Sequence, residues 1–208
     1  RNLAYKKLKK NKINVKRFEH KNYAKQFYES YFLQSLRQPP YIDVKLAISN
    51  DYLTINKKQK WITNNISRNI GNFLRSRYDC ILSTSKTINL DNPLLDCRIE
   101  GLEQKSPAVI IIDRSFKIKK KLKIFTNKNR EIFIFTQTNS NSKEEYFKKI
   151  GVNIIKLKRS ANSKDETTDV YFLLKQLGFN RILVESGIKY INEILKYNLI
   201  KNFYLFKS

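Results

Sequence analysis

Short apolar strands and amphipathic helices alternate along the chain from residue 41 onward. Residues 41–49 (YIDVKLAIS) predict a strand, because apolar and polar side chains alternate there. One face of this strand carries Ile42, Val44, Leu46 and Ile48. The run at residues 108–113 (AVIIID) is almost wholly apolar, which is typical of a strand buried on both faces. Further apolar runs predict strands at residues 80–83, 131–136, 152–157, 181–184 and 203–206.

Helical periodicity fills the intervals between these strands. Residues 64–77 predict a helix with one apolar stripe, of the kind that packs on a core, and this stripe consists of Ile66, Ile70, Phe73 and Leu74. Residues 143–150 and 168–177 predict two more helices, which end at Gly151 and Gly178. A last helix is predicted at residues 188–197. This alternation indicates an α/β domain in which helices cover both faces of a largely parallel sheet.

The segment before residue 38 has a different pattern. Residues 1–10 predict a short basic helix, residues 13–18 a short strand, and residues 22–36 a second helix. Gln38-Pro39-Pro40 then interrupts the chain, because neither proline continues a helix. We therefore expect a domain boundary there, with residues 1–37 in one unit and residues 38–208 in the other.

Composition excludes several classes of protein. A single His (His20) leaves no multi-histidine metal site, so we expect no bound metal, and five Gly exclude the glycine-rich nucleotide loops. Two Cys (Cys80 and Cys97) form no disulfide framework and indicate the cytoplasm. No apolar run approaches the ~20 residues that span a bilayer, so no membrane partner is expected. The H-x-E and P-C-x-x-C motifs of zinc deaminases are absent from the sequence.

The net charge of +24 leaves two interpretations open. One is a basic module that binds RNA or acidic partners. The other is compositional, because Lys, Asn and Ile are abundant, as an AT-rich coding sequence produces. The Lys residues are scattered apart from short clusters at 6–12 and 117–123, and no helix-turn-helix or RNA-recognition motif accompanies them. We therefore expect no nucleic-acid partner, and a basic surface that favours phosphorylated substrates.

Polar residues follow the predicted strands at residues 49–51, 83–85, 113–115, 136–137 and 185–187. Ligands of open α/β sheets bind outside the carboxyl ends of the strands, although ordinary loops are rich in the same residues. Glu185-Ser186-Gly187 is the most informative segment, because it ends an apolar strand and opens a helix. Gly187 lets a ligand approach the backbone, and a helix N-terminus favours a phosphate. Lys45 lies on the polar face of strand 41–49, either at an edge in water or directed inward to a site.

Six motifs occur in order along the chain: VKLAIS with Asp51, KWIT at 60–63, LRS at 74–76, CILSTSKTINLDNPLLDCR at 80–98, VIIIDR at 109–114 and ILVESG at 182–187. Over nearly all of residues 39–208 this order resembles the reductase domain of the bifunctional riboflavin-biosynthesis deaminase/reductase. Residues 1–37 resemble the C-terminal remnant of the deaminase domain. The resemblance implies a dihydrofolate-reductase-like fold. Compared with that family, the last strand of this chain is expected to be truncated.

The resemblance implies NADPH-dependent reduction of the ribosyl chain of 5-amino-6-(5-phosphoribosylamino)uracil to its ribitylamino form, with a homodimer as the assembly. The positions that match cofactor contacts are Ala47, Trp61, Thr87, Asp91, Arg114, Gly187, Ile188, Lys189, Tyr190, Ile191, Asn192 and Glu193. The positions that match substrate contacts are Gln59, Arg75, Leu95, Arg98 and Glu185.

The resemblance also suggests roles for these residues. Lys45, Asp91 and Glu185 are the candidate catalytic groups, with Lys45 as the preferred proton donor, because burial shifts the pKa of a lysine toward neutrality. Arg75 and Arg98 are the candidates for a clamp on the ribose phosphate. Arg114 takes a position where the family often has Ser, and we expect it to favour NADPH by pairing with the 2′-phosphate.

The sequence departs from the family pattern at two points. Asp51-Tyr52 replaces Asp-Gly, and Ser186-Gly187-Ile188 replaces Gly-Gly-Pro. Two alternatives stay open. One is another dihydrofolate-reductase-like enzyme, such as a reductase of the undeaminated diaminopyrimidine, and the other is the basic RNA-binding module.

Overall fold

A computed structural model of the chain describes residues 3–16, 22, 24–25, 28–29, 38–54, 62–127, 129–159 and 163–207. Its strands are β1 (Tyr41–Ile48), β2 (Cys80–Thr84), β3 (Ala108–Ile112), β4 (Ile132–Thr136), β5 (Asn153–Lys156), β6 (Arg181–Val184) and β7 (Ile200–Lys207). Its α-helices are α1 (Leu3–Lys10), α3 (Asn65–Arg75), α4 (Ser85–Asp91), α5 (Asn141–Lys149), α6 (Ser163–Gln176) and α7 (Ile188–Leu195). Two short 3₁₀ helices, η1 (Glu103–Lys105) and η2 (Lys123–Phe125), complete the described elements.

The strands form one seven-stranded sheet in the order β5-β4-β3-β2-β6-β1-β7. Every neighbouring pair in it is parallel. The predicted fold class, an α/β domain with a largely parallel sheet, is therefore confirmed. Because all the strands point the same way, their carboxyl ends lie along one edge of the sheet.

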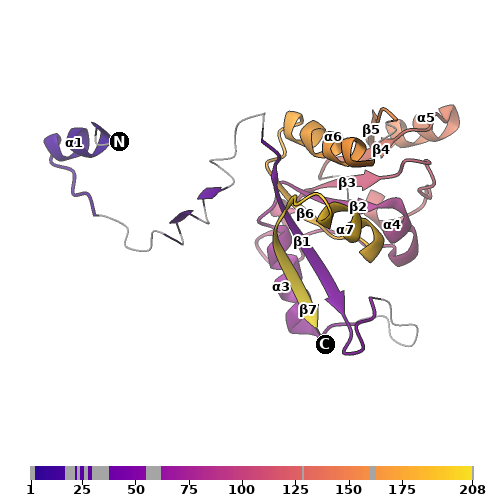
Figure 1. Cartoon of the computed structure of the whole chain (residues 1–208), viewed down its shortest axis with the longest axis horizontal. Helices are drawn as coiled ribbons and strands as arrows, with labels where there is room; N and C mark the ends of the chain where they lie inside the picture. The colour runs from indigo at the N-terminus through magenta and orange to yellow at the C-terminus, as the bar shows by residue number, and fades with distance from the viewer. Residues whose placement is uncertain are drawn as a thin grey trace.

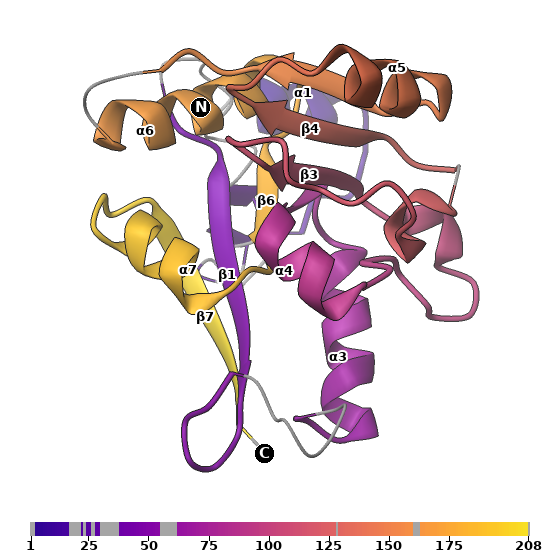
Figure 2. The same cartoon turned by 90° about the vertical axis from the view of Figure 1, so that its right-hand side faces the viewer.

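Two hydrophobic cores lie on opposite faces of the sheet. One packs α6 and α7 against the sheet through residues such as Tyr171, Leu174 and Ile191. The other packs α3, α4 and α5 against the opposite face through residues such as Leu74, Ile88 and Phe147, which are buried. Figure 2 shows α7 on one side of β1 and α3 on the other. The predicted three-layer arrangement follows from β3, whose residues are buried on both faces.

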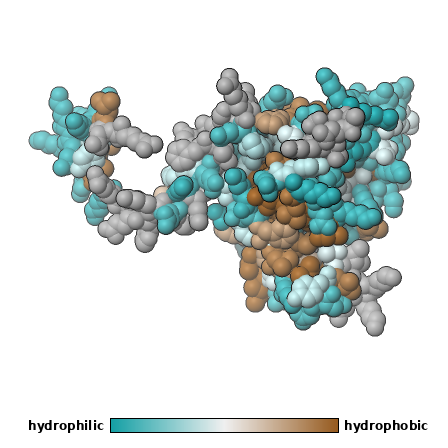
Figure 3. Space-filling view, viewed as in Figure 1, coloured by the Kyte–Doolittle hydropathy of each residue, from teal (hydrophilic) through white to brown (hydrophobic). Residues whose placement is uncertain are grey.

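The apolar stripe predicted for the helix at 64–77 does not face the core. Ile66 is 71% exposed, Ile70 and Phe73 are each 48% exposed, and only Leu74 of the four is buried. The buried positions of α3 are instead Gly71, Asn72 and Leu74. The reason is that α3 turns a polar face, including Asn72, toward functional side chains of the sheet. Figure 3 shows apolar side chains gathered on the part of the surface where α3 and β7 lie.

Other local predictions also need correction. Residues 13–16 form no strand, and the rest of the predicted strand at 13–18 lies outside the described residues, as does most of the helix predicted at 22–36. The basic helix predicted at residues 1–10 is α1, which has no buried residue and lies apart from the sheet (Figure 1). Helix α4 was not predicted, because its sequence SKTINLD has no continuous apolar stripe. It begins at a Thr84 cap and ends at Asn92, which has a left-handed backbone (φ 44°).

A buried carboxylate on β1 forms hydrogen bonds with β7 and with the segment before β2. Asp43 of β1 is fully buried, and its Oδ1 accepts hydrogen bonds from the backbone N and the Nδ2 of Asn202 in β7, each at 2.9 Å. The hydroxyl of Tyr78, just before β2, donates to Asp43 Oδ2. Burial raises the pKa of Asp43 above its ordinary value, although the hydrogen bonds from Tyr78 and Asn202 act in the opposite direction. This carboxyl therefore fixes β7 and the segment before β2 to β1.

Replacing Asp43 by Ala should destabilise the protein by about 3 kcal/mol, because it removes the acceptor of three hydrogen bonds, one from the buried Tyr78 hydroxyl and two from Asn202. Urea unfolding at neutral pH measures this loss. Glu100→Ala, which removes an exposed carboxyl, is the matched control and should change the free energy of unfolding by less than about 0.5 kcal/mol. A loss for Asp43→Ala no larger than that of the control would show that the network contributes nothing to stability.

Candidate functional site

The pairing of β1 with β6 brings a lysine and a glutamate together. Val44 pairs with Val184 in the parallel register, so the next residues along these strands are Lys45 and Glu185. Lys45 Nζ lies 3.7 Å from Glu185 Oε2. Lys45 therefore points inward, which decides between its two sequence interpretations, and the two residues sit where the strand-end rule predicts a ligand.

Arg75, at the end of α3, donates hydrogen bonds to both carboxylate oxygens of Glu185. Arg75 Nε donates to Glu185 Oε1 at 2.6 Å, and Nη2 donates to Oε2 at 3.0 Å. The side chains of Arg75 and Glu185 are only 12% and 10% exposed. Since α3 must bring Arg75 onto the sheet to form this pair, the polar face of the helix turns inward and its apolar stripe turns out.

The charges decide the protonation state of Glu185. Burial alone would raise the pKa of this carboxyl, but the charges of Arg75 and Lys45 outweigh burial and bring the pKa to about 2. Burial would likewise lower the pKa of Arg75, and Glu185 raises it instead. Glu185 is therefore an anion across the physiological range. It can accept hydrogen bonds and hold a cation, but it has no proton to donate.

A second arginine joins this network through an asparagine. Asn72 Oδ1 accepts from Arg75 Nη1 at 3.2 Å and from Arg98 Nη2 at 3.4 Å. Arg75 Nη1 also donates to the carbonyl of Asp96 at 3.1 Å, and the Asp96 carboxylate lies 3.3 Å from Arg98 Nε. Arg75 is thus committed to protein partners, whereas the side chain of Arg98 is 48% exposed. Of the two predicted phosphate ligands, Arg98 is the one that presents its guanidinium to solvent.

Hydroxyl groups gather beside the first turn of α7. Thr84 Oγ1 lies 3.1 Å from Thr87 Oγ1 and 3.2 Å from Ser186 Oγ, and the backbone N of Gly187 donates to Thr87 Oγ1 at 3.1 Å. Gly187 is the N-cap of α7 and supplies no side-chain capping bond. The first N–H groups of a helix have no partner inside it, so this turn can bind an anion.

Glycine at position 187 is not required by the protein around it. Its φ is −70°, which any residue adopts, and an added Cβ would lie 3.5 Å from Thr87 Oγ1, an ordinary contact. The absence of a Cβ leaves room for a ligand to approach the backbone at the start of α7. These groups together fit the pyrophosphate of a dinucleotide cofactor.

The remaining residues of the predicted cofactor segment divide between two surroundings. The side chains of Tyr190 and Ile191 are buried in the core under α7, so they support the helix from below. Ile188, Lys189 and Asn192 are exposed. Glu193 reaches Arg114, which follows β3, with 3.0 Å between its Oε1 and Arg114 Nη2. Arg114 Nε also lies 3.4 Å from Glu166 Oε2 of α6.

Several predicted residues lie elsewhere or cannot be placed. Asp91 ends α4 and, among the described residues, forms no ion pair with Lys45 or Arg75; burial raises its pKa. Leu95 is buried, and its carbonyl accepts a hydrogen bond from Arg130 at 2.6 Å. Ala47 lies two residues beyond Lys45 on the same face of β1. Gln59 and Trp61 lie outside the described residues.

The polar segments that follow the strands differ in the contacts they make. Asp113 is buried and structural, because it accepts from Ser85 Oγ at 2.8 Å and from the backbone N of Lys117 and of Ile118 at 2.9 and 2.7 Å. Ser49 and Asp51 hydrogen-bond to each other within their own turn. Only the segments at 83–85, 113–115, 136–137 and 185–187 therefore take part in contacts between strand ends.

Asn72 and Glu166 support the site through contacts that no motif shows, and the spacing of Asn72 and Arg75, one helical turn apart, is the one sequence signal for them. Asp96 and Ser186 lie within the segments at 80–98 and 185–187 noted above, but no motif assigns them a role of their own. Ser83 follows the residue that pairs with Val184, so it stands beside Glu185 on the neighbouring strand. Its hydroxyl is buried and has no hydrogen-bond partner among the described residues.

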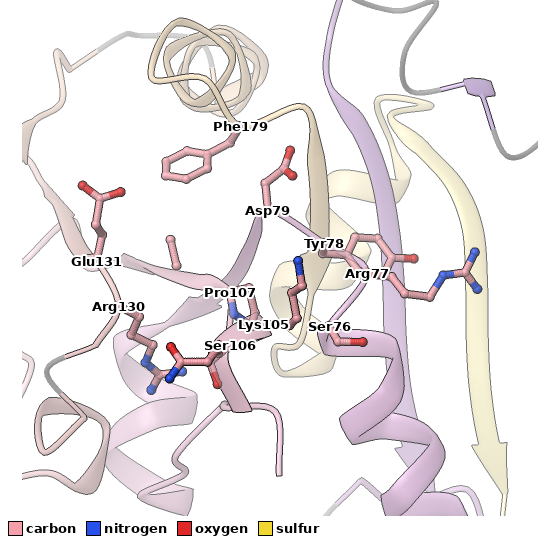
Figure 4. Close-up of a pocket in the computed structure, with 12 residues that line it drawn as sticks. Ser76, Arg77, Tyr78, Asp79, Lys105, Ser106, Pro107, Arg130, Glu131 and Phe179 are labelled. Atoms are coloured by element: carbon pink, nitrogen blue, oxygen red, sulfur yellow. The ribbon is translucent and has the colours of Figure 1, made fainter. Parts of the chain in front are cut away.

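Of two hollows in the described surface, the larger is not the site. It measures about 510 Å³ and is lined by Asp79, Ala108 and Glu131, at the beginnings of β2, β3 and β4 (Figure 4). Asp79 is committed there to the backbone N of Asn180 and of Arg181. The smaller hollow, about 340 Å³, lies against Asp96, Cys97 and Arg98 and adjoins the network of Arg75. No cluster of metal-ligating side chains and no helix long and apolar enough to cross a membrane occurs in the described parts of the chain.

Comparisons with known proteins point to proteins of riboflavin biosynthesis. The model of the family "RibD C-terminal domain" matches residues 40–207. The riboflavin biosynthesis protein RibD of Buchnera aphidicola is 29% identical over 182 residues, which cover 80% of this chain and 47% of that protein. The chain thus spans about half the length of this relative. A 2,5-diamino-6-ribosylamino-4(3H)-pyrimidinone 5′-phosphate reductase of Debaryomyces hansenii is 28% identical over 189 residues, covering 84% of this chain and 76% of that one.

A solved structure agrees with the fold. The structure of Acinetobacter baumannii RibD superposes with a TM-score of 0.76 at 19% identity, covering the whole of this chain and 57% of that one. The family match spans the described sheet and every side chain of the Lys45–Glu185–Arg75 network. This chain therefore belongs to the RibD C-terminal domain family, the reductase family of riboflavin biosynthesis.

Proposed function

We propose that this chain is a pyrimidine reductase, which uses NADPH to reduce the ribosyl chain of 5-amino-6-(5-phosphoribosylamino)uracil to the ribitylamino form. The observation that carries the proposal is the ion network of Lys45, Glu185 and Arg75 beside the N-terminus of α7. A charged pair and a helix N-terminus, the kind of turn that can bind a phosphate, lie at one edge of the sheet and support the proposal. Membership of the RibD C-terminal domain family gives this geometry its substrate class.

Different residues of the chain would bind the cofactor and the substrate. The first turn of α7 and the hydroxyls of Thr84 and Thr87 would hold the cofactor pyrophosphate. Arg98, the exposed member of the network, would bind the substrate phosphate. The domain boundary near residue 38 is part of this proposal: a reductase unit follows a remnant of another domain, and the start of β1 at Tyr41 and the family match from residue 40 support it.

The bound nicotinamide would supply the hydride. Lys45 would supply the proton, because its ammonium is the cation on β1 that meets Glu185, which would orient it from 3.7 Å. Arg75 is a positioning residue in this account: it keeps Glu185 ionised and fixed, so that Lys45 has one direction in which to point. Asp91, the last residue of α4, forms no ion pair with Lys45 among the described residues, so its catalytic role stays a prediction.

The similarity to the Debaryomyces hansenii reductase supports a second candidate substrate, the undeaminated diaminopyrimidine. Both substrates carry the same phosphorylated sugar, so the network around Glu185 serves either one. Parallel assays with the two pyrimidines distinguish them. A basic RNA-binding module is not supported by a comparable observation, since the site groups paired acids and bases instead of a stripe of lysines.

Replacing Lys45 by Met should lower kcat by about 10²–10⁴-fold, because the side chain keeps its length and loses its proton. The affinity for NADPH should stay within about threefold of wild type, because the pyrophosphate site is separate. Stopped-flow oxidation of NADPH and fluorescence titration measure the two quantities. Lys201→Met, on the exposed side of β7, is the control. A Lys45→Met enzyme with wild-type kcat would remove Lys45 from the reaction.

Two substitutions should separate substrate binding from cofactor binding. Arg98→Ala should raise KM for the phosphorylated pyrimidine by at least about tenfold, because a charged phosphate ligand is lost, and leave the Kd of NADPH unchanged. Gly187→Ala should raise the Kd of NADPH and leave KM for the phosphorylated pyrimidine unchanged, because an added Cβ would reduce the room for the pyrophosphate at the start of α7. Equal effects of Arg98→Ala on both ligands would contradict its role as a substrate ligand.

The low pKa of Glu185 predicts a pH dependence of stability. A carboxyl whose pKa is about 2 in the folded state and 4.5 ordinarily stabilises the fold above the ordinary value, and this contribution is lost as the pH falls toward 2. Between pH 5 and pH 3 the loss should be about 2 kcal/mol. Urea unfolding of Glu185→Gln should show a slope against pH that is shallower by this amount, while Glu100→Gln keeps the wild-type slope. Identical slopes for Glu185→Gln and wild type would refute the assignment.

A further inference from the structure

Arg114 lies between two helices and is held by a carboxylate from each. Its Nη2 is 3.0 Å from Glu193 Oε1 of α7, and its Nε is 3.4 Å from Glu166 Oε2 of α6. The side chain of Arg114 is 32% exposed, and those of Glu166 and Glu193 are 17% and 27% exposed. The guanidinium is therefore reachable from solvent, but two carboxylates already pair with its charge.

Further hydrogen bonds fix the two carboxylates in place. Thr167 Oγ1 donates to Glu193 Oε1 at 2.8 Å, and Gln137 Nε2 donates to Glu166 Oε1 at 2.9 Å. The backbone carbonyl of Arg114 accepts from the backbone N of Gln137 at 3.1 Å. One guanidinium and two carboxylates leave this cluster with a formal charge of minus one, although the chain as a whole carries +24.

The cluster lies within reach of the cofactor site described above. Arg114 follows the carboxyl end of β3, and Glu193 is six residues beyond Gly187, which corresponds to about 9 Å along the axis of α7. The adenosine ribose of a dinucleotide is attached directly to the pyrophosphate. A pyrophosphate at the first turn of α7 therefore brings this ribose to the region of Arg114.

The groups that meet this ribose decide between the two nicotinamide cofactors. A carboxylate accepts a hydrogen bond from the ribose 2′-hydroxyl of NADH, whereas an arginine accommodates the 2′-phosphate of NADPH. A 2′-phosphate entering here would add about two negative charges to a negative cluster. It would also compete with Glu166 and Glu193 for the charge of the guanidinium.

We infer that Glu166 and Glu193 determine the choice of cofactor, because they compete with the 2′-phosphate for Arg114 and offer acceptors to the 2′-hydroxyl, so that the site accepts NADH about as readily as NADPH. This inference rests on the proposed function. It changes the expectation drawn from the sequence, in which Arg114 alone favours NADPH: the arginine is present, but its charge is already balanced.

Fluorescence titration of the wild-type chain and of the Glu166→Gln and Glu193→Gln variants with NADPH and with NADH tests the inference. The two Kd values of the wild type should agree within about threefold. Each Gln variant should bind NADPH more tightly by about fivefold or more, and should leave the affinity for NADH unchanged or weaker. Thermal unfolding of each variant establishes that it is folded, and the amide of Gln keeps the shape of the carboxylate.

Glu144→Gln is the matched control, because it also removes a carboxylate from an ion pair, with Lys156, but on α5 and β5. It should leave the ratio of the two Kd values unchanged. Wild-type preference for NADPH by more than about tenfold, or an unchanged ratio in both Gln variants, would overturn the inference and leave the reductase proposal standing. Failure of the folded wild type to bind either cofactor would overturn the reductase proposal itself, and the inference with it.

Discussion

The ion pair between Arg75 and Glu185 is the interaction on which the rest of the site depends. Burying two charges is costly unless they meet in good geometry with their remaining donors and acceptors satisfied. Here both carboxylate oxygens are bound by the guanidinium, and the spare donors of Arg75 reach Asn72 and the Asp96 carbonyl. The pair fixes α3 on the sheet, keeps Glu185 ionised, and so gives Lys45 an anion to point at.

The parallel sheet makes this arrangement possible. Because β1, β6 and β2 run in the same direction and in register, Lys45, Glu185 and Ser83 follow the last paired residues of adjacent strands. The same edge receives the first turns of α4 and α7, whose hydroxyl and amide groups suit a phosphate. One edge of the sheet therefore brings together the groups needed to bind an anionic cofactor and to donate a proton.

The sequence was sufficient for the fold class and for the residues that directly follow strands. Period-two and continuous apolar runs specify strands, and strand ends specify where ligands bind, so Glu185 and Gly187 could be selected without a structure. Lys45 could be noted only as a lysine on the polar face of a strand, with two interpretations open. The orientation of α3 could not be predicted, because its apolar stripe of Ile66, Ile70 and Phe73 follows the ordinary rule for a buried face, and the ion pair of Arg75 overrides that rule. Long-range contacts, such as Glu166 with Arg114, leave no periodic signal at all.

The central claim is that a hydride passes from the nicotinamide to the sugar carbon at the edge formed by Lys45 and Glu185. The most direct test is a single turnover with the phosphorylated ribosylaminouracil and NADPH that carries deuterium at both C4 positions, followed by mass spectrometry of the product. The account predicts one deuterium on the C1 carbon of the new ribityl chain, and no transfer in Lys45→Met on the same timescale. A folded protein that binds both ligands and yields product without deuterium, or no product, would contradict it.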